Sequence, residues 1–372
     1  MDIDELLRYA AKYGASDLHI TVGNPPIVRV NGRLKKIPGP ALTQADAQAL
    51  VYAILSDEQR AGVERKRELD LSYTWGTATG RAPGSVSLEY VTPERIRARV
   101  NVFLDLSGIG AAFRIIPGKI RPLEELPTPE SVAERTRCQS GLVLVTGPTG
   151  CGKSTTLASM IDRIDQERSA RIITIEDPIE YIFQGRNCLI SQREIGTHSR
   201  SFALALRACL REDPDVILVG EMRDLETISL ALTAAETGHL VLSTLHTNNV
   251  AQTVDRVIDV FPADQHEYVR QIFANVIQGI ISQKLLLRKD GRGRIAAMEV
   301  LIVTPAVRNM VRENKSHQVF SLVQTGSEYG MQTMDHCLVE LLRKDLISPE
   351  VAYANARDKK LFVPPQGELR GD

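Results

Sequence analysis

The segment Gly147–Ser154 reads GPTGCGKS and matches the pattern G-x-x-x-x-G-K-[ST]. Its glycines let the backbone turn sharply, so that peptide N–H groups point inward at phosphate oxygens. The apolar stretch LVLVT precedes the segment, and the helix-forming stretch STTLASMIDRI follows it. A strand, a phosphate loop and a helix in this order are typical of a parallel sheet covered by helices. The sequence therefore predicts a nucleotide-binding α/β fold.

The loop also predicts which side chains contact the nucleotide. The helix that begins near Lys153 adds its positive N-terminal dipole, the Lys153 ammonium reaches the terminal phosphates, and the Ser154 hydroxyl ligates Mg²⁺. We interpret Cys151 as a small spacer, exposed enough to be modified. ATP is expected rather than GTP because no guanine-selecting N-K-x-D motif is present. The predicted nucleotide-binding residues are Gly147, Pro148, Thr149, Gly150, Cys151, Gly152, Lys153, Ser154 and Thr155.

Length and charge narrow the class of protein. A chain of 372 residues predicts two domains. The formal net charge of −1, from 45 basic and 46 acidic residues, argues against a broad nucleic-acid-binding face. Five cysteines without C-x-x-C spacing indicate a reduced cytoplasmic protein without a zinc site. The N-terminus does not resemble a signal peptide and no apolar run is long enough to span a bilayer, so any membrane association is expected to be peripheral.

Residues 1–116 are predicted to form a small α+β domain. An amphipathic helix over Ile3–Ala11, stopped at Gly14, is followed by short alternating strands with a hairpin turn at Asn31-Gly32. The strands ASDLHI, PPIVRV, ELDLSYTW, RIRARVNVF and AAFRIIP make up this domain. The segment Gly76–Pro93, rich in Gly, Thr, Pro and Ser, is predicted to be a loop or an extra hairpin.

A proline-bearing linker over 117–125 separates this domain from an ATPase domain over 126–362, and 363–372 is predicted to be a disordered tail. The apolar runs LVLVTG, IITIED, DVILVGE and HLVLSTLH lack alternation, as strands buried on both faces do. The helix between the last two runs is expected to begin after Asp224 and to stop at Gly238. Further segments are predicted to be mainly helical: 250–261, 267–287, 304–313, 334–344 and 348–356.

Acidic residues end two of the predicted parallel strands. Glu176, with Asp177 and Glu180 after it, ends one strand, and Glu221 ends another that begins near Asp215. Ligands bind at the carboxyl ends of the strands in open α/β sheets, so Glu176 and Glu221 should both face the phosphate loop. One carboxylate is needed to hold Mg²⁺, directly or through water, and another to activate the attacking water. Solvated surface charge is an equally good interpretation of Asp177 and Glu180.

Two histidines bracket the strand in GHLVLSTLHTNN. Seven extended residues span roughly 23 Å, too far for His239 and His246 to ligate one zinc ion on a straight strand. His246 follows the carboxyl end of the strand and is predicted to sense the γ-phosphate. His239 precedes the strand, so geometry alone predicts a structural role.

Taken together, these motifs resemble the secretion ATPases of type IV pili, and most closely the PilT-like retraction ATPases. The resemblance rests on GLVLVTGPTGCGKSTTLA, TIEDPIE, DPDVILVGEMRDLETISLALTAAETGHLVLSTLHTN and YGMQTMDHCL, and it extends from the ASDLHI segment to about Phe362. It implies a PAS-like N-terminal domain, a RecA-like P-loop ATPase core and a homohexameric ring.

The resemblance also implies roles for individual residues. TIEDPIE matches the Asp box, whose first glutamate, here Glu176, is the catalytic base. DPDVILVGE matches the Walker B motif, whose glutamate, here Glu221, serves Mg²⁺ together with Ser154. The stretch with His239 and His246 matches the His box, so both histidines are candidate catalytic residues.

Three arginines and one helix complete these implied assignments. Arg97, Arg99 and Arg114 match arginines that the family's N-terminal domain supplies to the nucleotide, which suits an arginine-finger role. The alternative is that they are ordinary surface arginines. TPAVRNMVRE resembles a helix that serves retraction rather than hydrolysis, with Arg308 and Asn309 as its polar positions.

The function implied is ATP hydrolysis that powers pilus retraction and twitching motility. The expected partner is an inner-membrane platform protein, and the expected location is the cytoplasmic face of that membrane. Gly76–Pro93 looks longer than the turn that is usual in the family. Extension ATPases generally carry additional N-terminal domains and a four-cysteine zinc site, and the sequence shows neither, which favours retraction over extension. Alternatives are the accessory retraction ATPase, a nucleic-acid-dependent RecA-like translocase and a P-loop kinase. No stable nucleic-acid partner is expected, because no basic, aromatic-lined segment is present.

Overall fold

A computed structural model describes residues 2–30, 32–75, 96–116 and 120–362. The Gly76–Pro93 segment, the predicted tail and residues 117–119 of the predicted linker lie outside these ranges. The chain divides into two compact units. One comprises Met1–Lys119 with Glu180–Gln184, and the other comprises Ile120–Ile179 with Gly185–Asp372.

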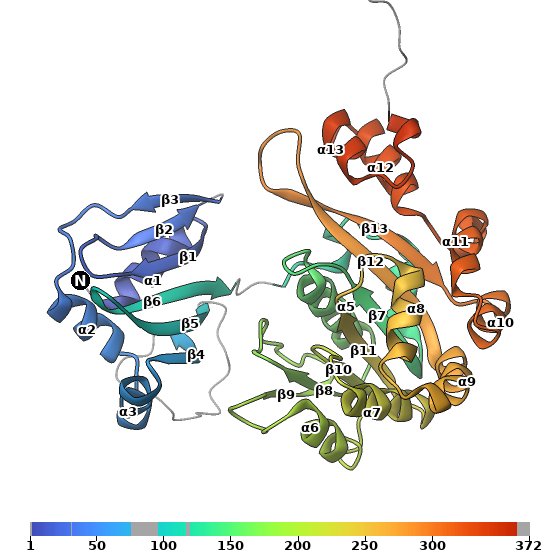
Figure 1. Cartoon of the computed structure of the whole chain (residues 1–372), viewed down its shortest axis with the longest axis horizontal. Coiled ribbons are helices and arrows are strands. Elements are labelled where there is room, and N and C mark those ends of the chain that lie inside the picture. The colour runs from blue at the N-terminus through green and yellow to red at the C-terminus, as the bar shows by residue number, and fades with distance from the viewer. Residues whose placement is uncertain (1, 31, 76–95, 117–119, 363–372) are drawn as a thin grey trace, which may run out of the picture. The chain divides into compact units, whose positions relative to one another are not determined.

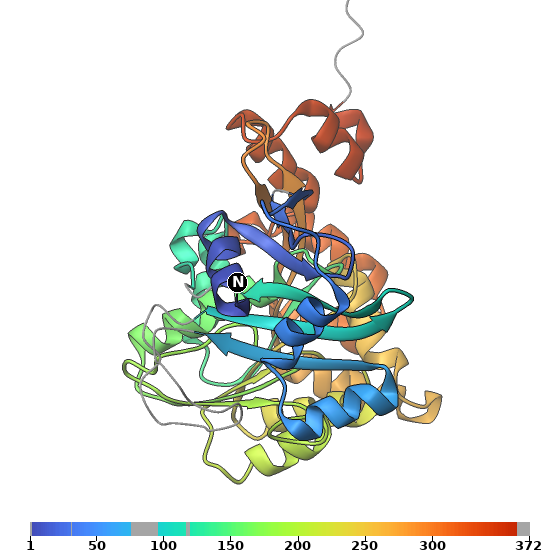
Figure 2. The same cartoon turned by 90° about the vertical axis from the view of Figure 1, so that its left-hand side faces the viewer.

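The first unit is an antiparallel sheet with helices packed on it (Figures 1 and 2). The strand order is β3-β2-β1-β6-β5-β4, and every adjacent pair is antiparallel. The predicted α+β class of this part of the chain is confirmed, although helices α2 and α3 were not predicted. Its elements are α1 (Ile3–Lys12), β1 (Ala15–Ile20), β2 (Ile27–Val30), β3 (Arg33–Lys36), α2 (Gln44–Tyr52), α3 (Asp57–Lys66), β4 (Glu68–Trp75), β5 (Ile96–Asp105) and β6 (Gly108–Ile116).

Alternation along the strands gives this sheet one apolar and one charged face. Leu18, Val100 and Phe113 are buried in a core that also contains Leu6 of α1 and Val51 of α2. Helix α1 begins at a capping box, in which the Asp2 carboxylate accepts from the Glu5 amide and the Glu5 carboxylate accepts from the Asp2 amide. The residues that alternate with the buried ones point to the opposite face.

The second unit is a mostly parallel sheet of order β13-β12-β7-β11-β10-β8-β9. The six strands from β12 to β9 in this order are parallel to one another, and only the edge strand β13 is antiparallel, to β12. The first elements are α4 (Glu130–Glu134), β7 (Gly141–Thr146), α5 (Lys153–Glu167), β8 (Arg171–Glu176), β9 (Leu189–Glu194), α6 (Phe202–Cys209), β10 (Val216–Val219), α7 (Leu225–Glu236) and β11 (Leu240–Leu245). The remaining elements are α8 (Val250–Asp259), α9 (His266–Val276), β12 (Ile277–Leu287), β13 (Arg294–Ile302), α10 (Pro305–Arg312), α11 (Ser316–Thr325), α12 (Met334–Arg343) and α13 (Pro349–Asn355).

The four apolar runs predicted to be parallel strands are β7, β8, β10 and β11, and all residues of β7, β10 and β11 are buried. Helix α7 begins after Asp224, whose side chain accepts from the Thr227 amide, and Gly238 follows its end with a φ of 107°. Both boundaries of this helix were predicted.

The prediction that 267–287 is mainly helical is wrong beyond Val276. Strand β12 occupies Ile277–Leu287 and pairs with β7 on one side and β13 on the other. Its sequence, IQGIISQKLLL, is apolar without alternation because both faces are covered, and such a run does not distinguish a buried strand from a buried helix. Strand β13 and helix α11 were not predicted.

Candidate nucleotide-binding site

The phosphate loop joins β7 to α5. Three glycines have left-handed or otherwise positive φ values: Gly147 at 141°, Gly150 at 76° and Gly152 at 93°. Gly152 is also the N-cap of α5, and no side chain caps the helix there. The loop and an uncapped helix N-terminus are the arrangement that binds phosphate through backbone N–H groups.

The start of the loop leaves no room for a side chain. A Cβ atom on Gly147 would lie 2.3 Å from the Gln283 carbonyl oxygen and 2.6 Å from the Cys151 sulfur. A Cβ on Gly150 would meet nothing within 4 Å. Gly147 is therefore required by a close approach to β12, whereas Gly150 is required only by its backbone conformation.

Lys153 supplies a cation inside the loop. Its side chain is buried, and Nζ donates to the carbonyl oxygens of Gly147 (2.9 Å) and Pro148 (3.2 Å). A buried ammonium that lies along a glycine-rich loop fits a polyphosphate ligand.

Cys151 is 3% exposed, so the expectation that it is accessible to modification is wrong. Burial also raises the pKa of its thiol, which keeps the sulfur protonated and unreactive. Its side chain fills the space beside Gly147, as a spacer should.

Glu221 follows β10 and lies beside His246, which follows the neighbouring strand β11. His246 Nε2 is 3.1 Å from Glu221 Oε1, and Arg223 Nε is 2.6 Å from the same oxygen. Burial raises the pKa of Glu221, but the hydrogen bond from Arg223 and the charge of His246 outweigh this effect, so the pKa lies below its usual value. Glu221 is thus held as a carboxylate.

Glu176 is the last residue of β8 and is half-buried. Its Oε1 accepts from Thr174 Oγ1 (2.6 Å) and from Gln192 Nε2 (3.3 Å). Strands β7, β8, β10 and β11 are parallel, so the P-loop, Glu176, Glu221 and His246 all lie at or just after the carboxyl ends of strands in one sheet.

The other acidic residues near these strands lie either on the surface or at the opposite edge of the sheet. Asp177 and Glu180 are exposed, in keeping with surface charge. Asp215 lies at the opposite edge of the sheet, where its carboxylate accepts from the Arg171 amide (2.7 Å) and fixes the start of β8.

His239 lies at the amino end of β11, away from the P-loop edge. Its Nδ1 is 2.8 Å from the Ala234 carbonyl oxygen and 3.2 Å from Thr237 Oγ1, and its own carbonyl accepts from the Gly141 amide. The structure therefore does not bring His239 to the P-loop of the same chain, and these contacts suit the structural role that geometry predicted.

The three predicted arginines lie on the first unit. Arg99 of β5 is in register with Arg114 of β6, so their side chains share a face of that sheet. Arg114 Nε donates to Asp17 Oδ1 (3.2 Å), and its side chain is largely exposed. Arg97, two residues before Arg99 on the same face, is half-buried.

Arg308 of α10 is not a freely projecting polar residue. Its Nη1 donates to the carbonyl oxygens of Ala274 and Asn275 at the end of α9. Arg312 of the same helix donates to the Asn275 side chain (2.6 Å), so α10 caps the C-terminus of α9. Asn309 accepts from Arg312 at 3.3 Å.

Gln283 was not predicted to belong to the site, because the sequence predicted a helix at this position. This side chain is 1% exposed, donates through Nε2 to the Cys151 carbonyl oxygen (2.6 Å) and accepts through Oε1 from Thr156 Oγ1 (2.9 Å). Glu299 of β13 was missed as well: it is 4% exposed and accepts from the Val250 amide at the start of α8 (2.8 Å).

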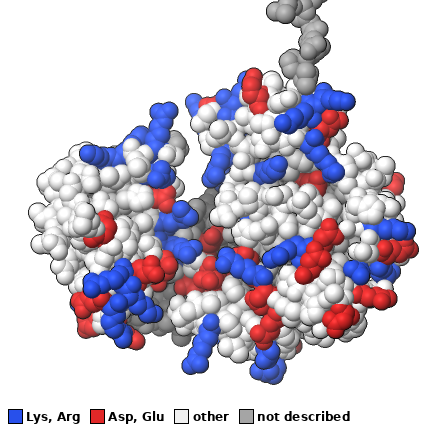
Figure 3. All heavy atoms as spheres, viewed as in Figure 1, with Lys and Arg blue, Asp and Glu red and all other residues white. Residues whose placement is uncertain are grey.

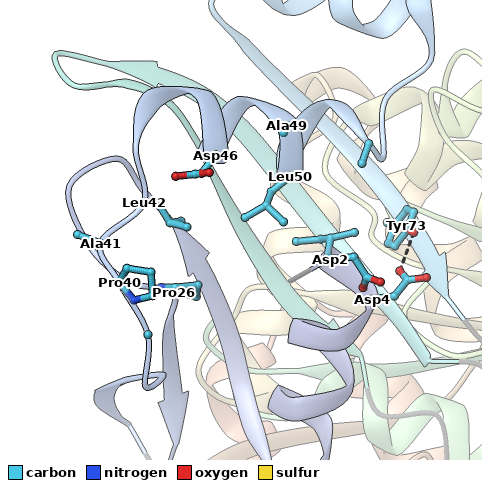
Figure 4. A pocket seen from close by; sticks show the side chains of 13 residues that line it. Asp2, Asp4, Pro26, Pro40, Ala41, Leu42, Asp46, Ala49, Leu50 and Tyr73 are labelled. Atoms are coloured by element: carbon cyan, nitrogen blue, oxygen red, sulfur yellow. Dashed lines mark hydrogen bonds between the residues drawn. The ribbon is translucent and has the colours of Figure 1, made fainter.

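A hollow of about 670 Å³ on the first unit is separate from these residues (Figure 4). Apolar side chains such as Leu42 and Leu50 line it, and the Asp4 carboxylate accepts from the Tyr73 hydroxyl at its edge (2.8 Å). Nothing in its lining suits a nucleotide, because Asp2, Asp4 and Asp46 make it acidic.

The described side chains include candidate ligands for the Mg²⁺ that accompanies a nucleotide. Basic and acidic side chains are interspersed on the face drawn in Figure 3. Within the described ranges, no three His, Cys, Asp or Glu residues are grouped to hold a metal ion, and no helix is long and apolar enough to cross a membrane. Mg²⁺ needs only one or two protein ligands beside substrate phosphates, so Ser154 and Glu221 fit it.

Comparison with known proteins identifies the family. The model described as "Type II/IV secretion system protein" matches residues 123–290. The Pseudomonas aeruginosa "Type IV pilus retractation ATPase PilT" is 50% identical over 359 residues, which are 96% of this chain and 98% of that protein. "Type IV pilus ATPase PilU" of the same organism is 38% identical over 375 aligned positions, which cover 100% of this chain and 94% of that protein.

Solved structures agree with this result and with the predicted α/β fold. The "Crystal Structure of the Pilus Retraction Motor PilT and Bound ADP" has a TM-score of 0.85 at 46% identity, and covers 97% of this chain and 98% of that chain. The Legionella pneumophila ATPase DotB has a TM-score of 0.79 at 31% identity, and covers 95% of this chain and 94% of that chain. The chain therefore belongs to the PilT-like retraction ATPases of the type II/IV secretion family and is an ATPase of that family.

Proposed function

We propose that this ATPase is the principal retraction motor of a type IV pilus, and that ATP hydrolysis drives removal of pilin subunits from the fibre. The observation that carries the proposal is the placement of the P-loop, Glu176 and the Glu221–His246 pair at the carboxyl ends of neighbouring parallel strands of one sheet. This constellation supplies a phosphate cradle, a base and a carboxylate for the metal.

Each side chain has a distinct task in the proposed hydrolysis. Lys153 and the loop amides bind the phosphates, and the Glu176 carboxylate accepts the proton of the attacking water. Ser154 and Glu221 would hold Mg²⁺, directly or through water, and the ion when bound neutralises phosphate charge. His246, bonded to Glu221, transmits the state of the γ-phosphate to the residues that follow β11.

We propose that the arginines of the first unit also supply positive charge to the nucleotide during hydrolysis. Arg99 and Arg114 share an exposed face and carry guanidinium groups suited to the charge that develops during phosphoryl transfer. Arg97 is proposed for the same role, although its half-buried side chain leaves less of it available. Supplying these groups from a separate unit makes catalysis depend on domain movement, which is how a motor couples hydrolysis to work.

We further propose that the chain acts as a homohexamer at the cytoplasmic face of the inner membrane, where it moves a platform protein. Support comes from the family and from the near-complete overlap with PilT. Identity of 50% to PilT against 38% to PilU favours the principal over the accessory motor. The proposed domains are 1–116 and 126–362, joined by 117–125.

A deletion strain tests the motor function. Cells that lack the gene should keep surface pili and lose twitching, and wild-type protein but not Lys153→Ala should restore movement. Bald cells would contradict a retraction role. Twitching cells with normal retraction would instead favour the accessory motor, and strong stimulation of the ATPase by DNA would favour a translocase.

A further inference from the structure

Strand β12 continues past the end of β7 and runs beside the phosphate loop. Ser282 is in register with Thr146, the last residue of β7, so the next residue, Gln283, lies beside Gly147. The 2.3 Å separation between a Cβ built on Gly147 and the Gln283 carbonyl oxygen shows how close the two backbones are.

The Gln283 side chain is a buried bridge between the loop and α5. Cys151 O can only accept a hydrogen bond, so the amide nitrogen of Gln283 must face it, and the amide oxygen must then face the Thr156 hydroxyl. Both halves of the amide are therefore satisfied and the orientation of the group is fixed. Gln283 is 1% exposed and Thr156 is 2% exposed, so water does not compete for either bond.

One of these bonds fixes the direction of a loop amide. The Cys151 carbonyl and the Gly152 N–H belong to the same trans peptide unit, in which C=O and N–H point in opposite directions. A carbonyl held toward Gln283 therefore directs the Gly152 N–H away from β12. Gly150 and Gly152, both at positive φ, flank Cys151 and make this peptide easy to rotate unless something holds it.

We propose that Gln283 is a positioning residue for nucleotide binding, which holds the Cys151–Gly152 peptide so that its N–H faces the phosphates. The inference rests on the proposed ATPase function only through nucleotide binding at this loop. Thr156 anchors the Gln283 amide oxygen, so the two side chains act as one support.

Gln283→Met tests this role, because methionine keeps an unbranched side chain of similar length and removes both hydrogen bonds. Gln278→Met is the matched control: Gln278 lies on the same strand, and its Nε2 donates to the Ser140 carbonyl oxygen (3.2 Å) before the other end of β7. The measurements are titration of the full-length protein with a fluorescent ADP, in Mg²⁺, and thermal unfolding with and without ADP.

The expected result is that Gln283→Met raises the Kd for ADP about tenfold, the factor that corresponds to about 1.4 kcal/mol or one net hydrogen bond. Gln278→Met removes one part-buried hydrogen bond, so it should also lower the unfolding temperature, yet it should bind ADP as the wild type does. Wild-type affinity in Gln283→Met would overturn the proposal, as would equal losses of affinity in both variants.

A second variant keeps the test decisive if Gln283→Met does not fold. Thr156→Val removes only the anchoring hydroxyl, and the proposal expects a smaller rise in the Kd for ADP, of about threefold. An unchanged Kd in Thr156→Val would then overturn it. Failure of nucleotide binding as such is distinguishable, because in that case the wild-type protein would not bind ADP either.

Discussion

His246 Nε2 lies 3.1 Å from Glu221 Oε1, so one contact joins the residues that follow the neighbouring strands β10 and β11. The same oxygen also accepts from Arg223 Nε at 2.6 Å. Glu221 is mostly buried, with 18% of its side chain exposed, whereas 76% of the Arg223 side chain is exposed. The two donors are therefore unequal: the His246 side chain is 39% exposed, so solvent screens it less than it screens Arg223.

This inequality predicts the result of removing each donor. His246→Ala should lower the ATP turnover rate by about tenfold to hundredfold, because a hydrogen bond to a charged group is worth about 1.5–3 kcal/mol. Arg223→Ala should lower the rate less, because its contact is exposed. Steady-state ATPase measurements on both variants check the order, and a larger loss in Arg223→Ala would contradict it.

Glu176→Gln should bind nucleotide normally and lose turnover. The amide keeps an oxygen that can accept from Thr174 but cannot take a proton from water, and loss of a general base costs about a factor of 10² to 10⁴. Asp177→Asn is the control, since Asp177 is the exposed neighbour at the same strand end. Titration with ADP and single-turnover hydrolysis are the measurements, and normal turnover in Glu176→Gln would remove this residue from the role of base.

The parts of the site that could be predicted are those whose structure depends on the local sequence. A phosphate loop is defined by its own residues, and Glu176 and Glu221 were found because an acidic residue at the end of a buried strand is conspicuous. Parallel strands then had to bring them to one edge. Gln283 and Glu299 could not be found this way, because each acts across the sheet from a strand whose apolar sequence does not fix its conformation. His239 shows the converse: the family motif includes it, but strand geometry places it at the opposite edge.

Two glycines of the loop should differ in their tolerance of a methyl group. Gly147→Ala would place Cβ 2.3 Å from the Gln283 backbone oxygen, so β12 or the loop must move. Gly150→Ala meets no atom within 4 Å and costs only the strain of a positive φ, about 1–2 kcal/mol. Thermal unfolding and ADP titration should show the larger loss in Gly147→Ala, and equal losses would contradict the close approach of β12.

Arg308 should contribute to stability through the end of α9. Arg308→Ala leaves the carbonyls of Ala274 and Asn275 without this donor and should reduce the free energy of unfolding by about 1–3 kcal/mol. Arg308→Lys keeps a charge and should be intermediate. Denaturant unfolding checks this order. If Arg308→Ala were as stable as the wild type yet failed in retraction, the residue would act through a contact outside the chain instead.

Glu299 should make stability depend on pH. Burial raises the pKa of its carboxyl above the usual value, an effect that the hydrogen bond from the Val250 amide and the charge of Arg357 only partly offset and that the Asp335 charge reinforces. A carboxyl whose pKa is raised on folding binds a proton more readily in the folded state. Preferential protonation of Glu299 in the folded state therefore stabilises the fold. This stabilisation is complete below the unfolded pKa of about 4.3, and it is lost as pH rises through the folded pKa.

Glu299→Gln removes this dependence, because an amide stays neutral and its oxygen can still accept from Val250. The variant should unfold at a higher temperature than the wild type at pH 8, and the difference should shrink as pH falls toward about 4. Glu350→Gln is the control: Glu350 is exposed, and a hydrogen bond from Ser348 lowers its pKa, so any difference should have the opposite sign. Unfolding temperatures of the three proteins between pH 4 and 8 measure the effect. A Glu299→Gln variant that is less stable than the wild type at pH 8 would show that the ionised carboxylate, placed at the N-terminus of α8, stabilises the fold more than its burial destabilises it.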